Sequence, residues 1–129
     1  MAAALFCLAW IQPLPTRSEV VLDGSMGTAG PVGGPAYDIT SGLGKINGDN
    51  LFHSFSDFNI LNGESAIFSG PVFIDNIISR VTGGRSSTID GLIQSTIANA
   101  DFYFINPSGI IFTSGAQLDI GSSSGGPGS

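Results

Sequence analysis

The chain has 129 residues, of which 42% are hydrophobic and only 11% are charged, and it contains 19 glycines and 7 prolines. This composition favours one small, turn-rich all-β domain over a helical or disordered protein. Ten acidic and four basic residues give a net charge of −6, which would repel a nucleic acid or an anionic membrane surface. We therefore expect no nucleic-acid partner.

The first 18 residues differ in character from the rest. Their apolar run, residues 2–11, is too short to span a bilayer but has the length of a signal-peptide core. No basic residue precedes Arg17, so the usual positive start is missing, and a buried strand or helix is the alternative. We predict that residues 1–18 are an export signal. The single cysteine, Cys7, lies within it, so the remaining chain can form no internal disulfide.

Residues 19–60 give mixed signals. A short apolar strand is expected at Val20 to Leu22, followed by glycine- and proline-rich turns. In the next segment, NLFHSFSDFNI, the residues Phe52, Phe55 and Phe58 recur every third position. This spacing fits either a helical stripe or a strand.

After the turn dipeptide Asn62-Gly63, six segments read as strands bounded by Gly, Pro, Asn or Ser: SAIFSG, VFIDNIISRV, STIDGLIQS, DFYFINP, GIIFTSG and AQLDIGS. In DFYFI, alternation directs Phe102 and Phe104 into a core, so that Tyr103 and Ile105 would need another cover. In AQLDIG, alternation places Leu118 and Ile120 on one side. No helix is expected between these strands.

A loose repeat runs through the same region. An aliphatic residue precedes Asn or Asp and a glycine at residues 46–48, 61–63, 89–91 and 105–109. The intervals of 15, 28 and 16 residues are irregular, but they suggest stacked coils of a solenoid. Residues 123–129 form a Gly/Ser-rich tail without a capping helix, and we expect that a C-terminal continuation of the solenoid is missing.

The order and spacing of five sequence words are more specific. Asn50 to Ile60 is followed by NIISRVTGG, IDGLI, INPSGIIF and AQLDIG. Together they resemble the N-terminal haemagglutination activity domain of the filamentous haemagglutinin family, the two-partner secretion domain. The resemblance covers residues 19–122.

This resemblance implies a right-handed parallel β-helix, a single-stranded solenoid with short extra strands. It also implies a secretion domain of an adhesin-like exoprotein of a Gram-negative bacterium, secreted or held at the cell surface. Its partner would be an outer-membrane β-barrel transporter, which binds the domain through periplasmic POTRA domains. The domain would then nucleate folding of the β-helix.

Two short motifs characterise the family, Asn-Pro-Asn-Leu and Asn-Pro-Asn-Gly-Ile. The second matches Asn106, Pro107, Ser108, Gly109 and Ile110, with Ser108 in place of Asn. The first has no counterpart, since residues 69–78 read SGPVFIDNII. Independently of the family, Asn-Pro-Ser-Gly predicts a rigid turn: Asn accepts a backbone N–H, Pro presets φ, and Gly supplies a positive φ. A purely structural turn is favoured over direct contact with the transporter.

We expect the residues that bind the partner to lie in these family words: Asn50, Phe52, His53, Asn76, Arg80 and residues 106–110. Arg80 stands in an otherwise apolar strand. If buried, it would need an acidic partner, such as Asp75 or Asp101. Truncation of Arg80 is therefore expected to destabilise the fold more than truncation of Arg85.

Residues with catalytic potential are few. His53 is the only histidine, with Asp57 four residues on, and no nucleophile is evident. Asp90 and Asp101 are the acidic residues that stacking is most expected to bring together. GGRSSTIDG resembles a calcium-binding repeat only at its opening glycines. We predict no catalytic residue, no metal and no cofactor.

Two alternatives remain open at this stage. The first is a fragment of a carbohydrate-active β-helix enzyme. The second is a free-standing adhesin that binds host or cell-surface glycans, for which exposed aromatic residues would be needed. The candidate residues are Phe52, Phe55, Phe58 and Tyr103.

Overall fold

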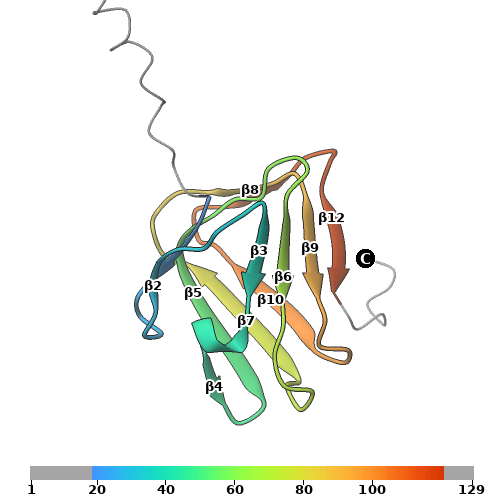
Figure 1. The fold of residues 1–129 in the computed structure, drawn as a ribbon. Coiled ribbons are helices and arrows are strands. Elements are labelled where there is room, and N and C mark those ends of the chain that lie inside the picture. Colours follow the sequence, from blue (N-terminus) through green and yellow to red (C-terminus); the bar gives the residue numbers. More distant parts are fainter. Residues whose placement is uncertain (1–18, 121–129) are drawn as a thin grey trace, which may run out of the picture.

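Short strands separated by tight turns wind into three stacked coils in the computed structural model, which describes residues 19–120 (Figure 1). The predicted export signal and the predicted tail lie outside the described residues. Among the described residues, no helix is long and apolar enough to cross a membrane. The elements are β1 (Val20–Asp23), β2 (Ala29–Pro31), β3 (Ala36–Ile39), the 3₁₀ helix η1 (Ser41–Leu43), β4 (Lys45–Asn47), β5 (Asn50–Phe58), β6 (Ser65–Phe68), β7 (Asn76–Val81), β8 (Ser87–Ile89), β9 (Leu92–Ser95), β10 (Asp101–Ile105), β11 (Ile110–Phe112) and β12 (Gln117–Ile120).

The second and third coils each add one strand to each of three parallel stacks. The parallel stacks are β5-β7-β10, β3-β6-β9-β12 and β8-β11, and in the first coil Ile60 forms a single parallel bridge to Ile89. Figure 1 shows β3, β6, β9 and β12 side by side, with β5, β7 and β10 forming a second layer. Register partners recur after about 25 residues, as in Asn50, Asn76 and Asp101. The predicted parallel β-helix is confirmed.

This period explains the irregular repeat in the sequence. The words at residues 61–63 and 89–91 occupy the same corner of successive coils, because Asp90 N–H donates to the Ile60 carbonyl at 2.7 Å. Residues 46–48 instead form the turn of the β4–β5 hairpin, and residues 105–109 form a different corner. The intervals between the repeated motifs are irregular because the motifs occupy different kinds of turn, and only the interval between residues 61–63 and 89–91 corresponds to one coil.

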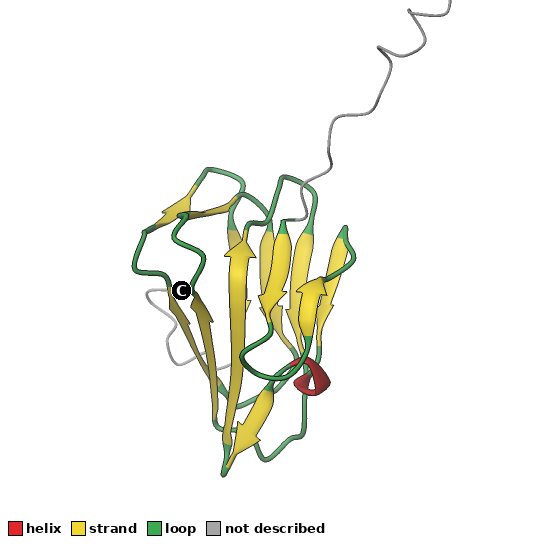
Figure 2. Cartoon of the chain, turned by 90° about the vertical axis from the view of Figure 1, so that its left-hand side faces the viewer, coloured by secondary structure: helices red, strands yellow, loops and turns green. Residues whose placement is uncertain are grey.

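Antiparallel strands cover the start of the solenoid. The predicted strand at Val20 to Leu22 is confirmed as β1, which pairs with β2 on one side and β5 on the other, while β4 pairs with the first half of β5. These strands thereby extend the sheet of β5, β7 and β10. Figure 2 shows that strands joined by loops make up the described chain apart from the short helix η1, in red. β3 is held to the first coil by the hydroxyl of Tyr37, which donates to Glu64 at 3.1 Å. Burial and this hydrogen bond raise the pKa of Tyr37 to about 12.

The three phenylalanines of β5 lie on a strand and not on a helix. Phe52 points outward, whereas Phe55 and Phe58 are both fully buried. Two inward residues three positions apart break strict alternation. The break is made by an irregularity in pairing with β1, where Val21 is opposite Asp57 and Leu22 is opposite Phe55, so that one residue is skipped.

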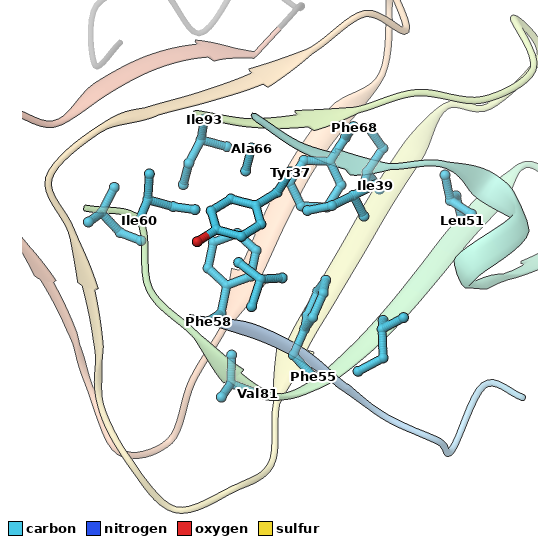
Figure 3. Packing of buried hydrophobic residues seen from close by; sticks show 14 of the residues in the cluster. Tyr37, Ile39, Leu51, Phe55, Phe58, Ile60, Ala66, Phe68, Val81 and Ile93 are labelled. Carbon is cyan, nitrogen blue, oxygen red and sulfur yellow. The ribbon is translucent and has the colours of Figure 1, made fainter. Parts of the chain in front are cut away.

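The core fills the space between the layers. Figure 3 shows Tyr37, Ile39, Phe55, Phe58 and Phe68 gathered in the interior, with Phe68 above and Phe55 and Phe58 below. The Phe58 ring lies 5.0 Å from Phe55 and 4.8 Å from Phe104, between ring centroids. Aromatic pairs at such spacings contribute about 0.5–1.5 kcal/mol beyond burial. The contact between Phe58 of β5 and Phe104 of β10 therefore ties the first coil to the third.

The third coil keeps apolar side chains partly uncovered. As predicted, Phe102 and Phe104 point inward and pack against the core, but Tyr103 and Ile105 face solvent without a covering layer and are 48% and 50% exposed. Leu118 and Ile120 share one side as predicted, opposite inward-facing residues of β9. Leu118 is nevertheless 42% exposed, because no described coil stacks on its outer side.

One predicted strand begins later than expected. Of the segment VFIDNIISRV, only Asn76 to Val81 forms β7. Val72 and Phe73 lie in the preceding loop and are exposed, and Ile74 is the first buried residue. Pro71 accounts for the delay, because its carbonyl accepts a turn hydrogen bond from the Ile74 N–H at 3.2 Å.

Candidate binding face and corner

Four of the ten residues selected from the sequence, Asn50, Phe52, Asn76 and Arg80, lie together on one side of the solenoid. The outward side chains of β5, β7 and β10 form three rows across the strands, which we call the outer face. Because parallel register places equivalent residues side by side, each row has one member per coil. The rows are Asn50–Asn76–Asp101, Phe52–Ile78–Tyr103 and Ser54–Arg80–Ile105.

The first row is polar. The Asn76 side-chain amide donates to the Asn50 side-chain oxygen at 2.8 Å, which joins two coils. At the same end of the strands, the Asp75 N–H donates to the Asp49 carbonyl and the Asp101 N–H donates to the Asp75 carbonyl. These three aspartates therefore lie next to one another in successive coils. The pKa of the Asp75 carboxyl is raised by its hydrogen bond with Asp49 and by the neighbouring negative charges. This end of the outer face is acidic.

The second row is apolar. Phe52 and Ile78 are half-buried, and Tyr103 is exposed. Lys45 of β4 lies opposite Phe52 in the antiparallel pair and so continues the row with a positive charge. Ile105 in the third row extends the apolar strip on β10. Exposed aromatic and aliphatic side chains held on rigid strands are typical of protein-binding surfaces.

The third row rests on a polar network. Arg80 is exposed, and its Nε donates to Ser54 Oγ at 2.8 Å while Nη2 donates to Ser25 Oγ at 3.1 Å. Both serine hydroxyls donate to Asp23, as does the Thr82 hydroxyl. Burial alone would raise the pKa of Asp23, but these hydrogen bonds outweigh it and lower that pKa far below its usual range. The network joins the β1–β2 cap to β5 and β7.

The predicted buried ion pair of Arg80 is therefore wrong. Its side chain lies on the solvent side of β7 and binds serine hydroxyls, not Asp75 or Asp101. Asp49 and Asp75, which precede β5 and β7, and Asp101, the first residue of β10, lie at the opposite end of these strands from Arg80. Among residues 19–120, the one salt bridge joins Arg85 Nε to Asp57 at 2.7 Å.

Asn106 to Ile110 form the corner between β10 and β11, with the geometry that the sequence predicts. Asn106 Oδ1 accepts the Ser108 N–H at 2.9 Å, and the Asn106 carbonyl accepts the Gly109 N–H at 2.9 Å. Gly109 has a φ of 110°, which favours glycine. The Asn106 amide also donates to the Arg85 carbonyl at 3.0 Å and to Ser87 Oγ at 2.9 Å. The corner is thus bonded to the coil below.

His53 does not belong to the outer face. Its ring points into the core, is 1% exposed, and lies 5.6 Å from the Phe68 ring. Nε2 lies 2.9 Å from the Thr40 carbonyl, which can only accept, so Nε2 carries the proton. Nδ1 is buried without a partner. Burial lowers the pKa of His53 despite the Thr40 contact, and the residue anchors the loop before η1 to β5.

The arrangement does not bring the predicted acidic pair together. Asp101 stacks on Asp75 at one corner, whereas Asp90 binds the Thr113 hydroxyl and the Gly115 N–H at another. Within the part of the chain that the structure describes, no three His, Cys, Asp or Glu residues gather in a way that could hold a metal ion. Of the aromatic residues considered for glycan binding, Phe55 and Phe58 are buried, which leaves Phe52 and Tyr103.

Sequence reasoning missed two contributors to this surface. Asp23 and Ser25 come from a segment read only as a turn, yet they orient Arg80 from 55 or more residues away. Nothing local in the sequence marks them. For Tyr103 and Ile105 the sequence does carry a signal, because alternation in β10 directs both side chains away from the core.

Comparison with known proteins places the chain in a family. The family model described as the TPS secretion domain matches residues 18–126. A stretch of 63 residues, 49% of this chain, is 35% identical to the heme/hemopexin-binding protein of Haemophilus influenzae, and this stretch spans only 7% of that relative. No solved structure gives a significant match. The chain belongs to the TPS secretion domain family, and it is the secretion domain of a two-partner secretion exoprotein.

Proposed function

We propose that the domain is recognised in the periplasm by the POTRA domains of its outer-membrane transporter, and that the outer face is the surface bound. Membership of the family implies such a transporter as partner and secretion from a Gram-negative bacterium. The observation that carries the proposal is the outer face itself. Four residues chosen from the sequence, Asn50, Phe52, Asn76 and Arg80, lie there beside the uncovered side chains of Tyr103 and Ile105.

The physical character of the outer face supports protein binding. The side chains stand on hydrogen-bonded strands, so little conformational entropy is lost when a partner orders them. Tyrosine and arginine are enriched among the residues that dominate interface energetics. The net charge of −6 favours a transporter surface that is positive overall.

Binding of purified periplasmic domains of the transporter tests the proposal. We expect the double variant Tyr103→Ser/Ile105→Ser to weaken binding by about ten-fold or more, since truncated interface anchors commonly have such effects. Ile111→Ser is the matched control, because Ile111 is equally exposed on β11 outside the outer face. Equal affinities for the double variant and the control would refute the assignment of this face. Thermal unfolding would verify that both variants fold.

We also propose that the third coil templates the β-helix of the exoprotein. Phe112 and Leu118 stand above the buried Ile89 and Ile93 of the second coil and are about half exposed. A further parallel coil would bury them and pair with the edges of β10, β11 and β12, which no residue between 19 and 120 occupies. Refolding of the whole exoprotein should slow markedly in Leu118→Asp but not in Ile111→Asp, which points outward. Equal refolding rates would contradict the template.

We also propose that the domain is a non-enzymatic module, and two features of the described residues support this. The ring of the only histidine is buried, and Asp90 and Asp101 occupy different corners. Glycan binding by the isolated domain is the second candidate function, favoured by exposed Tyr103. Saturable binding of a glycan that Tyr103→Ser abolishes, without any transporter binding, would support it instead.

A further inference from the structure

A small groove opens where the outer face meets the corner of the third coil. It has a volume of about 260 Å³ and lies between the ends of β7 and β10. Val81, Ile105 and Pro107 give it a largely apolar lining, and Arg80 and Ser108 contribute polar groups. Ile105 is half exposed, so the groove is open to a partner that approaches the outer face.

The guanidinium of Arg80 is held in one orientation beside this groove. One of its edges is occupied, because Nε donates to Ser54 and Nη2 donates to Ser25. Those hydroxyls are themselves fixed by donating to the Asp23 carboxylate. Nη1 makes no hydrogen bond or ion pair with any residue between 19 and 120. A guanidinium has five N–H donors, so the fork formed by its two terminal nitrogens is left for another acceptor.

The other arginine of the described chain shows the contrast. Arg85 places Nε and Nη2 on the two carboxylate oxygens of Asp57, at 2.7 and 2.8 Å, and its charge is matched within the domain. Arg80 has no carboxylate within salt-bridge distance among the described residues. An oriented guanidinium that forms no direct ion pair within residues 19–120, next to an apolar groove, has the geometry for a bidentate carboxylate.

We propose that the groove receives an acidic side chain of the transporter's periplasmic region, carried next to an aliphatic side chain. The aliphatic group packs on Ile105 and Pro107, and the carboxylate binds the terminal fork of Arg80. This proposal rests on the proposed function and names the chemistry that the partner must supply. A chain-terminal carboxylate is a poorer fit, since such groups are held by nests of backbone N–H groups, whereas the donor here is a side chain.

The domain's net charge of −6 disfavours an acidic segment at long range. The carboxylate is therefore recognised at contact distance. Recognition depends on the geometry of its hydrogen bonds to Arg80 more than on the electrostatic potential of the whole domain. Lysine at position 80 would keep the charge but lose the fork. Arg80→Lys is consequently the variant that separates geometry from charge.

Blocked peptides test the groove without the transporter. Nuclear magnetic resonance would follow the Arg80 Nε–H and the Ile105 methyl groups of the full chain during titration. We expect an acetylated, amidated peptide containing Leu-Asp to shift both signals saturably, and its Leu-Asn counterpart to bind about ten-fold more weakly. Equal binding of the two peptides would overturn the proposal. Tighter binding of a peptide that ends in a free α-carboxylate would overturn the choice of a side chain.

Variants in the full chain complete the test against the purified periplasmic domains. Arg80→Gln and Arg80→Lys should both weaken binding by about ten-fold, and Arg85→Gln should leave it within about two-fold. Wild-type affinity in both Arg80 variants would refute the anchor while transporter recognition stands. If the wild type binds the Leu-Asp peptide but not the periplasmic domains, transporter recognition fails and the carboxylate site remains. Thermal unfolding confirms that each variant is folded.

Discussion

Replacement of Asn106 by alanine should destabilise the domain strongly for a single polar substitution. The variant loses three side-chain hydrogen bonds, to the Ser108 N–H, the Arg85 carbonyl and Ser87 Oγ. Each contributes about 0.5–1.5 kcal/mol net. Ser87 is fully buried, and loss of its partner adds to the cost. We therefore expect a loss of about 2–4 kcal/mol in the free energy of unfolding.

Urea denaturation followed by circular dichroism measures this loss. Asn62→Ala is the matched control, because Asn62 is an exposed turn asparagine and its truncation should change stability by about 0.5 kcal/mol or less. An Asn106→Ala variant as stable as this control would refute the structural account of the corner. It would also leave contact with the transporter as the remaining explanation for any secretion defect in that variant.

Three further predictions concern the core, the polar network and the buried histidine. Phe58→Ala should cost about 3–5 kcal/mol of unfolding free energy, and Phe112→Ala clearly less because Phe112 is half exposed; similar losses in urea denaturation would contradict the burial pattern. Arg80→Ala should destabilise more than Arg85→Ala in thermal melts, since Arg80 hydrogen-bonds the buried Ser54 of β5 and Ser25 of the β1–β2 cap, whereas the Arg85 side chain is 60% exposed and ion pairs of exposed side chains contribute little. Because burial lowers the pKa of folded His53, the unfolded state binds more protons, and stability should fall as the pH drops from about 6.5 towards that lowered pKa. His53→Gln should flatten this fall, and an unchanged pH profile would refute the assignment.

Patterns of neighbouring residues in the sequence predicted most of the strands and the turn at residues 106–109. Alternation and turn residues predicted β6, β7, β10, β11 and β12 with errors at their ends, and Asn106-Pro107-Ser108-Gly109 predicted a turn that the structure has. These features depend on residues only a few positions apart. The segment STIDGLIQS was expected as one strand, but Asp90 and Gly91 divide it into β8 and β9, which join different sheets. The family words supplied the coil architecture, which composition alone did not.

Features that depend on register across a coil were beyond the sequence. The partners that orient Arg80 lie 26 and 55 residues away, and the apolar sequence around it suggested burial, although alternation places Arg80 outward. The buried pair Phe55 and Phe58 depends on an irregularity in pairing with β1. A contact with a residue one coil away leaves no pattern in the local sequence. An irregularity in strand pairing leaves none either. The same reason prevented prediction that Asp101 stacks on Asp75 and not near Asp90.

Secretion of the chain tests the central claim most directly. The 129-residue chain would be exported to the periplasm behind a standard signal peptide, in strains with and without the cognate outer-membrane transporter, and periplasm and medium would be assayed separately. The account predicts that the chain appears in the medium only when the transporter is present, and that Tyr103→Ser/Ile105→Ser remains in the periplasm as a folded protein. A folded wild-type chain retained in the periplasm of both strains would contradict it.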